Sequence, residues 1–381
     1  MIPLAIPNLA GNERQYLNEC IDTTFVSTVG PFVTRFESQI SEASGYAHTV
    51  ATSAGTTGLH AALVAVGVTP GDLVITPGLS FIATANAVAH AHAQPWLVDI
   101  NEHSWTLDPE ALARALKEKT TPGKDGLPVH RPTGKRVSAI VPVYTLGMPA
   151  DMDAIAAIAR EYRLPIVADA AAGLGARYKD RPLGDMGADL TMFSFNGNKT
   201  VTAGGGGAIS GNDRKLVNLV RHLTTTARVG ADYDHDRVGF NYRMTNLQAA
   251  VGCAQMELLD RFVEKKRAIS RFYDESFKDL PATRPFPSPE FAHSACWFSG
   301  FVLESGDSAS LRQALRAQGV AARPFWKPLN HQVPFADAPR DALRVCENIW
   351  NRIVTLPCST GITDDELATV VAAVRREVLG K

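Results

Sequence analysis

Short apolar runs alternate with helix-like stretches between about residues 50 and 210 of this chain. The runs of strand length are Leu73–Thr76, Pro95–Val98, Ser138–Val143, Pro165–Ala168 and Leu190–Phe193. The helix-like stretches between them are Gly58–Val66, Ile82–His90, Pro109–Lys117 and Met152–Tyr162. Strands separated by helices of this length form parallel βαβ units, with helices on both faces of the sheet. The alternation therefore predicts an α/β fold whose active site lies at the carboxyl ends of the strands.

The pattern changes after this region and predicts a second domain. The segment from Thr245 to Tyr273 is expected to form one long helix, and four prolines follow it closely. A strand at Trp297–Val302 and helices at Ala309–Gln318 and Asp364–Leu379 then predict an α+β arrangement. We expect a large domain with an N-terminal arm at residues 1–260 and a smaller C-terminal domain at residues 261–381.

The segment Thr120–Arg136 interrupts the alternation. It is rich in proline, glycine and charged residues, which predicts a long exposed loop inserted before a core strand. A loop of this kind is either functional or a solvated excursion, and the sequence leaves both readings open.

Composition and charge exclude several classes of function. The 381 residues are 45% hydrophobic and 20% charged, with a formal net charge of −1, as in an ordinary soluble globular protein. No basic excess indicates binding to nucleic acid, and no apolar stretch is long enough to span a membrane. Five scattered cysteines without a C-x-x-C pair argue against a disulfide framework and a zinc site. Because the N-terminus also lacks an export signal, we expect a cytoplasmic protein that holds no metal.

The most unusual stretch of the sequence surrounds Lys199. Asn196, Gly197 and Asn198 precede the lysine, and four consecutive glycines follow it at positions 204–207. Glycines let the backbone come close to a bound group and leave N–H groups accessible. A lysine in such surroundings is either a phosphate-binding charge or a nucleophilic amine.

Two further stretches bear on this choice. The small residues of Thr52–Gly58 open a helix, whose first N–H groups and positive dipole end suit an anion, although a plain helix cap explains them equally well. Asp169 ends a buried strand, where a carboxylate needs a partner: it is a helix cap, a metal ligand or the counterion of a buried cation. Because Asp169 and Lys199 are about one βαβ step apart, we expect them on neighbouring strand ends.

A third stretch, Gly239–Asn246, crowds polar and aromatic residues in front of the long helix. Thr245 is suited to cap that helix. A helix cap does not explain why so many polar and aromatic residues stand next to Thr245.

An anion cradle, a strand-end aspartate and a glycine-flanked lysine together describe a site for pyridoxal phosphate (PLP). The lysine would form a Schiff base with the cofactor, Asp169 would keep the pyridine nitrogen protonated, and the cradle would bind the phosphate. An anion cradle at Thr52–Gly58, with Ser194 close enough in sequence to reach an anion near Lys199, would relieve the lysine of the phosphate and favours its role as an amine.

The chain resembles the fold-type I PLP enzymes and, among them, the nucleotide-sugar aminotransferases often called the DegT family. The resemblance extends over nearly the whole chain and lies in Gly55-Thr56, Pro70–Asp72, Ser80–Ala87, Asp169–Ala171, the Lys199 segment, Asn241–Asn246, Arg323–Leu329 and Leu356-Pro357. It implies an aspartate aminotransferase-like fold, with a mostly parallel sheet flanked by helices and a smaller α+β domain.

One subgroup is especially similar to this sequence. The order Ser194–Lys199 with the four glycines, and the segment Thr120–Arg136, resemble enzymes that aminate C4 of UDP-linked 4-keto-6-deoxy-N-acetylhexosamines in bacillosamine- and legionaminic-acid-type pathways. The resemblance implies that L-glutamate donates the amino group. Amination at C3, or of a GDP- or dTDP-linked keto sugar, remains the alternative.

The resemblance also implies a role for each residue around the cofactor. Lys199 would be the Schiff-base lysine and proton shuttle, and Asp169 would pair with the pyridine nitrogen. Phe81 would stack on the cofactor ring, although a core position explains this phenylalanine as well. The phosphate would be bound by Gly55, Thr56 and Ser194.

Other residues are expected to act across a subunit boundary or on the substrate. Asn241 would reach the phosphate of the neighbouring subunit's cofactor, which implies a homodimer with shared active sites. The nucleotide sugar would be contacted by Ser27, Thr28, Gly30, Trp326, Lys327 and His331, of which Trp326 and His331 also suit a core and a surface position.

Two positions depart from the family pattern. The family usually carries Gln, His or Glu three residues after the aspartate, where this chain has Ala172. It commonly has a histidine where this chain has Tyr144. Ala172 removes a polar contact near the cofactor, and PLP binding is still expected.

Three other functions compete with an aminotransferase. A related PLP-dependent sugar dehydratase would replace the lysine with histidine, so Lys199 argues against it. A dinucleotide-dependent oxidoreductase would need a G-x-G-x-x-G after its first strand, which is missing. A non-catalytic PLP-binding regulator would need a basic DNA-binding segment, and none is visible.

Overall fold

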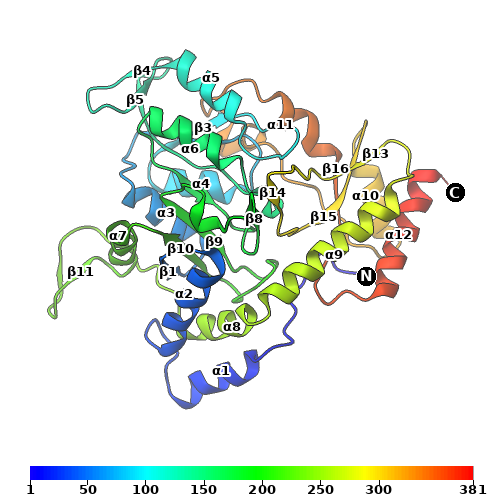
Figure 1. Cartoon of the computed structure of the whole chain (residues 1–381), viewed down its shortest axis with the longest axis horizontal. Coiled ribbons are helices and arrows are strands. Elements are labelled where there is room, and N and C mark those ends of the chain that lie inside the picture. The colour runs from blue at the N-terminus through cyan, green and yellow to red at the C-terminus, as the bar shows by residue number, and fades with distance from the viewer. Residues whose placement is uncertain (381) are drawn as a thin grey trace.

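The computed structural model describes residues 1–380 and is built around one twisted sheet (Figure 1). Along one half the strands follow the order β1 (His48–Thr52), β10 (Gly207–Gly211), β9 (Leu190–Ser194) and β7 (Val167–Asp169). The other half contains β6 (Lys135–Ile140), β2 (Leu73–Pro77) and β3 (Gln94–Val98). Bridges from Ile140 to Ile166 and from Val143 to Asp169 join the two halves. β10 is antiparallel to both neighbours, and the other pairings in this order are parallel.

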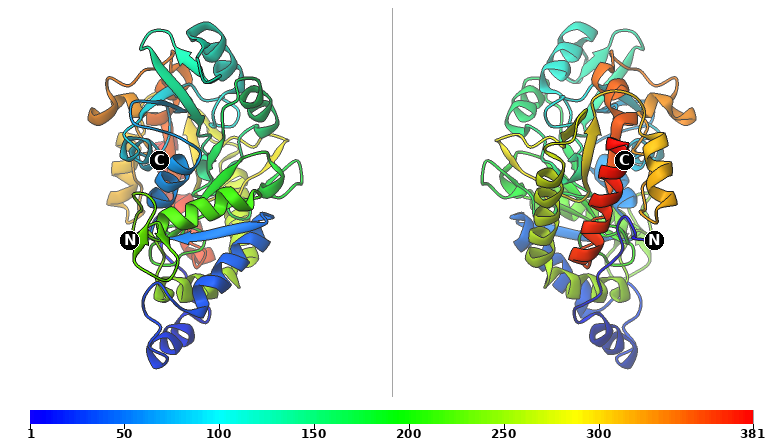
Figure 2. Two further views of the ribbon diagram at one scale, coloured as in Figure 1. Left: turned by 90° about the vertical axis from the view of Figure 1, so that its left-hand side faces the viewer. Right: turned by 90° about the vertical axis from the view of Figure 1, so that its right-hand side faces the viewer.

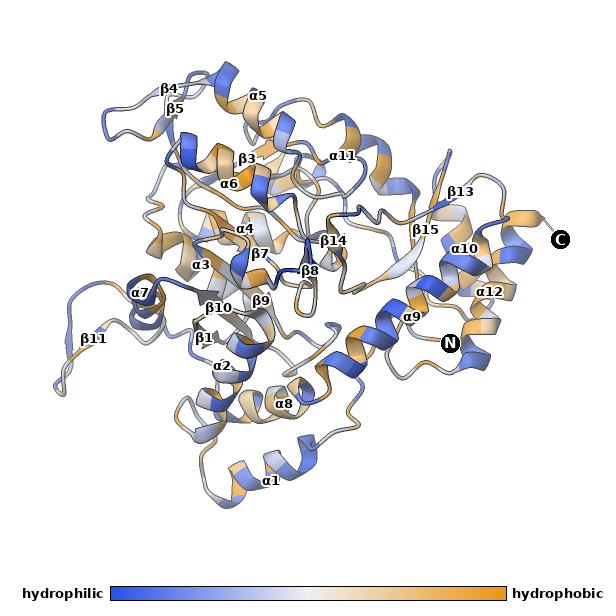
Figure 3. Ribbon diagram, viewed as in Figure 1, coloured by the Kyte–Doolittle hydropathy of each residue, from blue (hydrophilic) through white to orange (hydrophobic). Residues whose placement is uncertain are grey.

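Helices cover both faces of the sheet, because neighbouring strand residues enter two different cores. Ile75 and Phe193 belong to one core with Phe36, whereas Val74 and Met192 belong to the other. In Figure 3 β3 is coloured as hydrophobic and the visible side of α7 as hydrophilic, as expected for a buried strand and a covering helix. The covering helices are α2 (Pro31–Ser44), α3 (Gly55–Ala65), α4 (Ala83–His90), α5 (Pro109–Lys119), α6 (Met152–Glu161), α7 (Arg214–Thr224) and α8 (Asn246–Met256). The predicted α/β alternation is confirmed.

The C-terminal part forms a smaller antiparallel sheet. Its strands are β13 (Thr283–Pro285), β15 (Ser299–Leu303) and β16 (Ile353–Leu356), and its helices are α9 (Leu259–Phe277), α10 (Ala309–Ala317) and α12 (Asp364–Leu379). The N-terminal residues also lie here, since Ile2 bridges Val320, and both chain ends stand at this end of the molecule (Figures 1 and 2). The expected boundary after residue 260 falls in the first turn of α9, and the division into domains stays a prediction.

Short elements complete the chain. The helix α1 (Glu13–Asp22) packs against α8. The helix α11 (Arg344–Ile349) is held beside β3, because Asp99 accepts hydrogen bonds from the N–H groups of Val345 and Cys346 at its start. The remaining strands are β4 (Thr120–Pro122), β5 (Pro128–His130), β8 (Arg177–Tyr178), β11 (Arg228–Val229), β12 (Asp234–His235) and β14 (Ala292–His293). Single 3₁₀ turns occupy Thr145–Gly147, Leu183–Asp185, Leu329–His331, Val333–Phe335 and Trp350–Arg352. Within residues 1–380, no helix combines the length and apolarity needed to cross a membrane.

The segment Thr120–Arg136 is largely exposed and leads into the core strand β6, as predicted, but it is a β-hairpin, so the prediction of a loop was wrong. Thr120, Thr121 and Pro122 pair with His130, Val129 and Pro128, and β5 then continues against β6. Arg136 anchors the hairpin, since its guanidinium binds Asp72 at 2.6 Å and Asp125 at 3.2 Å. The turn residues dominate the composition of the segment and obscure the two short strands.

The expected long helix from Thr245 to Tyr273 is two helices. α8 ends at Met256 and α9 begins at Leu259, so the chain changes direction at Glu257 and Leu258. Glu257 accepts hydrogen bonds there from Tyr16 at 2.6 Å and Arg35 at 2.6 Å. The break lets α8 pack on α1 and α2 while α9 runs to the C-terminal sheet (Figure 1).

The start of α8 agrees with the sequence. Thr245 is its N-cap: the Thr245 hydroxyl accepts the N–H of Gln248, and the Gln248 side chain accepts the N–H of Thr245. This reciprocal pair satisfies two N–H groups that a helix terminus would otherwise leave free.

Lys266 on α9 joins the helix to the C-terminal strands. Its side chain is 2% exposed, and Nζ donates to the carbonyl oxygens of Trp297 at 2.9 Å and Cys358 at 2.7 Å. Trp297 precedes β15 and Cys358 follows β16, so one ammonium group ties α9 to both of these segments.

We predict that Lys266→Met lowers the free energy of unfolding by about 3 kcal/mol, because methionine leaves two buried carbonyl groups without donors. Chemical or thermal unfolding checks this. The matched control is Lys265→Met, since Lys265 lies on the same helix and reaches only the exposed Asp364 at 4.0 Å. Equal stability of the two variants would show that Lys266 has no such role.

Candidate active site

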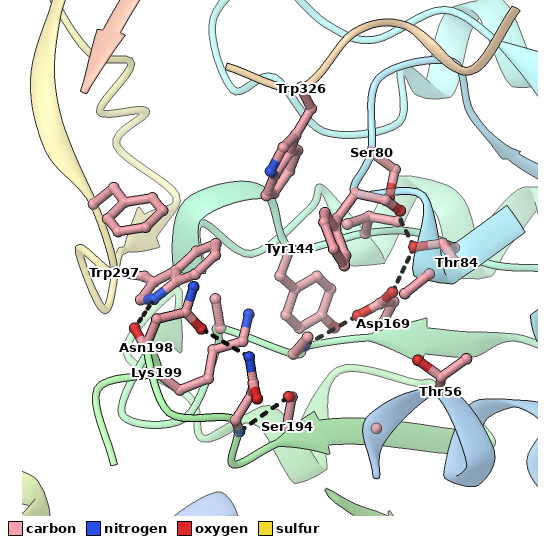
Figure 4. Close-up of a pocket in the computed structure, with 18 of the residues that line it drawn as sticks. Thr56, Ser80, Thr84, Tyr144, Asp169, Ser194, Asn198, Lys199, Trp297 and Trp326 are labelled. Atoms are coloured by element: carbon pink, nitrogen blue, oxygen red, sulfur yellow. Dashed lines mark hydrogen bonds between the residues drawn. The ribbon is translucent and has the colours of Figure 1, made fainter. Parts of the chain in front are cut away.

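A cavity of about 410 Å³ opens at the carboxyl ends of β7 and β9. One wall comes from the central sheet and the start of α3, and the opposite wall comes from the C-terminal residues around Trp297 and Trp326 (Figure 4). Seven predicted site residues line it: Gly55, Thr56, Phe81, Asp169, Ser194, Lys199 and Trp326. The parallel pairing of β7 with β9, in which Asp169 aligns with Met192, is the neighbouring arrangement that the sequence predicts.

Asp169 is held rigidly at the base of the cavity. The residue is 5% exposed, its Oδ2 accepts the Thr84 hydroxyl at 2.6 Å, and its Oδ1 accepts the N–H of Ala171 at 3.1 Å. Burial raises the pKa of the carboxyl group above its ordinary value, although these two hydrogen bonds and the charge of Lys199 oppose the shift. Two hydrogen bonds thus orient the Asp169 carboxylate, but nearby positive charge does not fully offset the cost of its burial.

Lys199 faces the same cavity from the turn after β9. Burial lowers the pKa of its amine from 10.5 to about 8, while the charge of Asp169 acts in the opposite direction. The Nζ atom lies 3.6 Å from the centre of the Trp297 ring. A substantial fraction of Lys199 is therefore neutral near physiological pH, as a nucleophile or proton acceptor must be.

The start of α3 forms a cradle of backbone N–H groups. The first N–H groups of a helix have no partner within the helix, and here they border the cavity at Gly55 and Thr56. Two glycines permit the close packing: a Cβ atom on Gly55 would lie 2.9 Å from Met192 Sδ, and one on Gly207 would lie 2.5 Å from the backbone nitrogen of Gly55. The last of the four glycines thus brings β10 against the cradle.

Six predicted site residues do not line this cavity. Ser27, Thr28 and Gly30 belong to the segment between α1 and α2, where the Ser27 carbonyl accepts the N–H of Asn246 at 2.6 Å. Asn241 is exposed and bridges Thr225. Lys327 and His331 are exposed beyond Trp326. Contacts of these residues with a second subunit or a substrate stay predictions.

Both departures from the family pattern lie at the cavity. Ala172 and Tyr144 line it, and the Tyr144 N–H donates to the Asp169 carbonyl at 2.9 Å. The Tyr144 side chain is 2% exposed, and burial raises the pKa of its hydroxyl well above the usual range. The tyrosine therefore remains neutral and fills space behind Asp169.

Sequence reasoning missed three residues of the site. Thr84 orients Asp169, and its hydroxyl lies 2.7 Å from that of Ser80. The two residues are four positions apart at the start of a predicted helix, and this spacing could have indicated that their side chains meet. Trp297 and Arg323 line the cavity from the C-terminal part. No local signal connects these two residues with Lys199, because they reach it only through the tertiary fold.

The residues present fit PLP. The cavity has the size of a small-molecule site and contains a helix N-terminus for a phosphate, a hydroxyl at Ser194 and a carboxylate for a ring nitrogen. Lys199, with its lowered pKa, supplies the amine. The buried carboxylate of Asp169 would be stabilised by a cationic group of a ligand.

Comparison with known proteins agrees with this chemistry. The profile of the DegT/DnrJ/EryC1/StrS aminotransferase family matches residues 7–375. The chain is 37% identical over 383 residues to a GDP-perosamine synthase of Caulobacter vibrioides, covering 98% of this chain and 97% of the relative. It is 35% identical over 376 residues to a Bacillus subtilis protein named putative pyridoxal phosphate-dependent aminotransferase EpsN, covering 97% and 94%. The solved aminotransferase TlmJ of Streptoalloteichus hindustanus has a TM-score of 0.89 at 25% identity, covering 100% and 99%. The chain belongs to the DegT/DnrJ/EryC1/StrS aminotransferase family and is a PLP-dependent nucleotide-sugar aminotransferase.

Proposed function

We propose that this aminotransferase moves the amino group of L-glutamate onto the C4 keto group of a nucleotide-linked 4-keto-6-deoxy sugar, with Lys199 and Asp169 as its catalytic residues. The observation that carries the proposal is the placement of both side chains in one cavity, on neighbouring strand ends and beside a helix N-terminus. When bound, PLP supplies an aldehyde that can carry an amino group and a ring that withdraws electrons from the adjacent carbon.

Asp169 would hold a proton on the ring nitrogen of the cofactor. A carboxylate in low-dielectric surroundings favours a cation beside it. Thr84 and the N–H of Ala171 fix the direction of the two carboxylate oxygens, so Asp169 would pair with that nitrogen without reorganising.

Lys199 would bind the cofactor through Nζ and, once free, move a proton. Its Nζ would accept a proton from the carbon that bears the amino group and return it to the carbon on the other side of the nitrogen, which requires the neutral amine in the first step and the ammonium in the second. A pKa near 8 makes both forms accessible.

The remaining predicted residues complete the proposal. Gly55, Thr56 and Ser194 would bind the phosphate, and Phe81, which is 55% exposed at the cavity, would cover the ring. Asn241 would complete the phosphate site of a second subunit in a homodimer. The sugar nucleotide would be contacted by Ser27, Thr28, Gly30, Trp326, Lys327 and His331.

The nucleotide is the least constrained part of the substrate. The Ser194–Lys199 stretch and the four glycines favoured a UDP-linked N-acetyl sugar. The 37% identical relative is named for GDP-perosamine, whose sugar is a 4-amino-4,6-dideoxy sugar. The sequence resemblance and this relative both favour amination at C4. We propose a GDP-linked sugar as the preferred substrate, with the UDP-linked sugar as the competing candidate.

A substrate panel tests this proposal. Enzyme loaded with the aminated cofactor is mixed with GDP- and UDP-linked 4-keto-6-deoxy sugars and with a UDP-linked 3-keto sugar. We expect amination at C4, seen by NMR of the product, with the GDP-linked sugar reacting fastest. Amination of the 3-keto sugar alone would overturn C4, and a faster UDP-linked sugar would overturn the choice of nucleotide.

We predict that the ligand-free protein takes up PLP on Lys199 with a pH midpoint near 8 instead of 10.5. The ammonium form cannot attack the aldehyde, so uptake rises as pH increases through the lowered pKa. Borohydride trapping followed by peptide mass spectrometry measures the adduct. Lys199→Met should give none, and an adduct on another lysine would contradict the assignment.

We predict that Asp169→Asn lowers kcat about a hundredfold, because the isosteric amide removes the charge that stabilises the cationic ring. It should also lower the pKa of Lys199 further, since the Asp169 charge raises it. The matched control is Thr84→Val, which keeps the charge and removes one hydrogen bond, and for which we expect a loss of about tenfold. If both variants lose the same amount of activity in single-turnover reactions with glutamate, the orientation of Asp169 and not its charge is what matters.

A further inference from the structure

Trp297 lies directly against the amine of Lys199. The Nζ atom is 3.6 Å from the ring centre, on the side of the cavity opposite Asp169 and Thr84 (Figure 4). The Trp297 indole N–H donates to the carbonyl oxygen of Asn198 at 2.7 Å. One side chain thus contacts both the reactive nitrogen and the turn that carries it.

Trp297 is itself firmly fixed. The residue is 5% exposed, and its ring stacks on Phe298 with centroids 4.1 Å apart. Its backbone N–H donates to Leu146 at 3.0 Å, and its carbonyl accepts the buried Lys266 ammonium at 2.9 Å. The indole therefore has little freedom to move away when the lysine moves.

The face of an aromatic ring attracts an ammonium group and is nearly indifferent to a neutral amine. Within the cavity, burial acts against the ammonium form of Lys199. The charge of Asp169 opposes this effect from the other side of the cavity, and the ring face opposes it in direct contact, 3.6 Å from Nζ. The ring thereby stabilises the protonated lysine at this wall of the cavity.

We propose that Trp297 is a positioning residue that holds the free, protonated Lys199 side chain at the cavity wall between the two proton transfers of the reaction. The inference rests on the proposed role of Lys199. The C–H bond of the substrate breaks as an N–H bond forms at Nζ, and the ammonium then remains over the indole until it returns the proton. The hydrogen bond to Asn198 keeps the Lys199 turn in reach of the ring.

The indole N–H signals of ¹⁵N-labelled, ligand-free protein test this directly, because the chain has five tryptophans and Trp297→Phe identifies the relevant signal. We expect the Trp297 signal to shift with pH around a midpoint near 8 and to lose that shift in Lys199→Met. A Trp297 signal that does not follow the titration of Lys199 would overturn the inference.

Reactivity of Lys199 toward an amine-selective acylating reagent, read by peptide mass spectrometry against pH, supplies a second readout. Trp297→Leu should lower the midpoint by about one pH unit, because the ammonium loses the ring face. Trp297→Phe should lower it less, since a ring remains, and the distant Trp350→Leu should leave it unchanged. A rise in Trp297→Leu would mean that the indole only excludes water, and would overturn the inference.

These outcomes are separate from those of the proposed function. If PLP forms no reducible adduct on Lys199, the proposed function fails even though Trp297 and Lys199 titrate together. If the adduct forms but the Trp297 signal is insensitive to pH, only the inference about Trp297 fails.

Discussion

The parallel pairing of β7 with β9 determines the chemistry of this protein. It sets Asp169, the last residue of β7, beside the end of β9, from which the chain turns directly into the Lys199 segment. The connection between the two strands contains only β8 and one 3₁₀ turn, and a carboxylate and an amine that lie far apart in the sequence thereby face one cavity. The antiparallel β10 completes the arrangement, because its first residue, Gly207, allows the start of α3 to approach the same sheet edge.

The two charged groups are poorly stabilised while they face each other alone. Burial raises the pKa of Asp169 and lowers that of Lys199, so desolvation of both groups outweighs their mutual attraction. A ligand that brings a cationic ring nitrogen to Asp169 and a carbonyl carbon to Lys199 relieves both penalties. Binding of such a ligand to the folded chain should therefore also stabilise the fold.

Much of this could be predicted from sequence because the signals are local. The strands and helices of the large sheet follow periodicity, and the strand-end position of Asp169 and the glycines around Lys199 mark the site directly. The hairpin at Thr120–Pro122 and Pro128–His130 was missed because turn residues dominate so short a segment. The break after Met256 was missed because its cause, the packing of α8 and α9 on different partners, is tertiary. The family match supports an aminotransferase over an oxidoreductase, a dehydratase or a regulator, and does not identify the nucleotide.

Trp297 illustrates what local patterns cannot contain. It belongs to the C-terminal part of the chain, yet it contacts the nitrogen on which the proposed reaction depends. Its backbone is held from one side by Leu146, two residues beyond Tyr144 at the cavity, and from the other by Lys266 on α9. The environment of Lys199 is consequently set by the packing of α9 and the C-terminal strands as well as by the sheet that carries the lysine. Substitutions far from the cavity that loosen this packing should therefore change the protonation of Lys199 before they unfold the protein, because the ring acts on the ammonium only at short range.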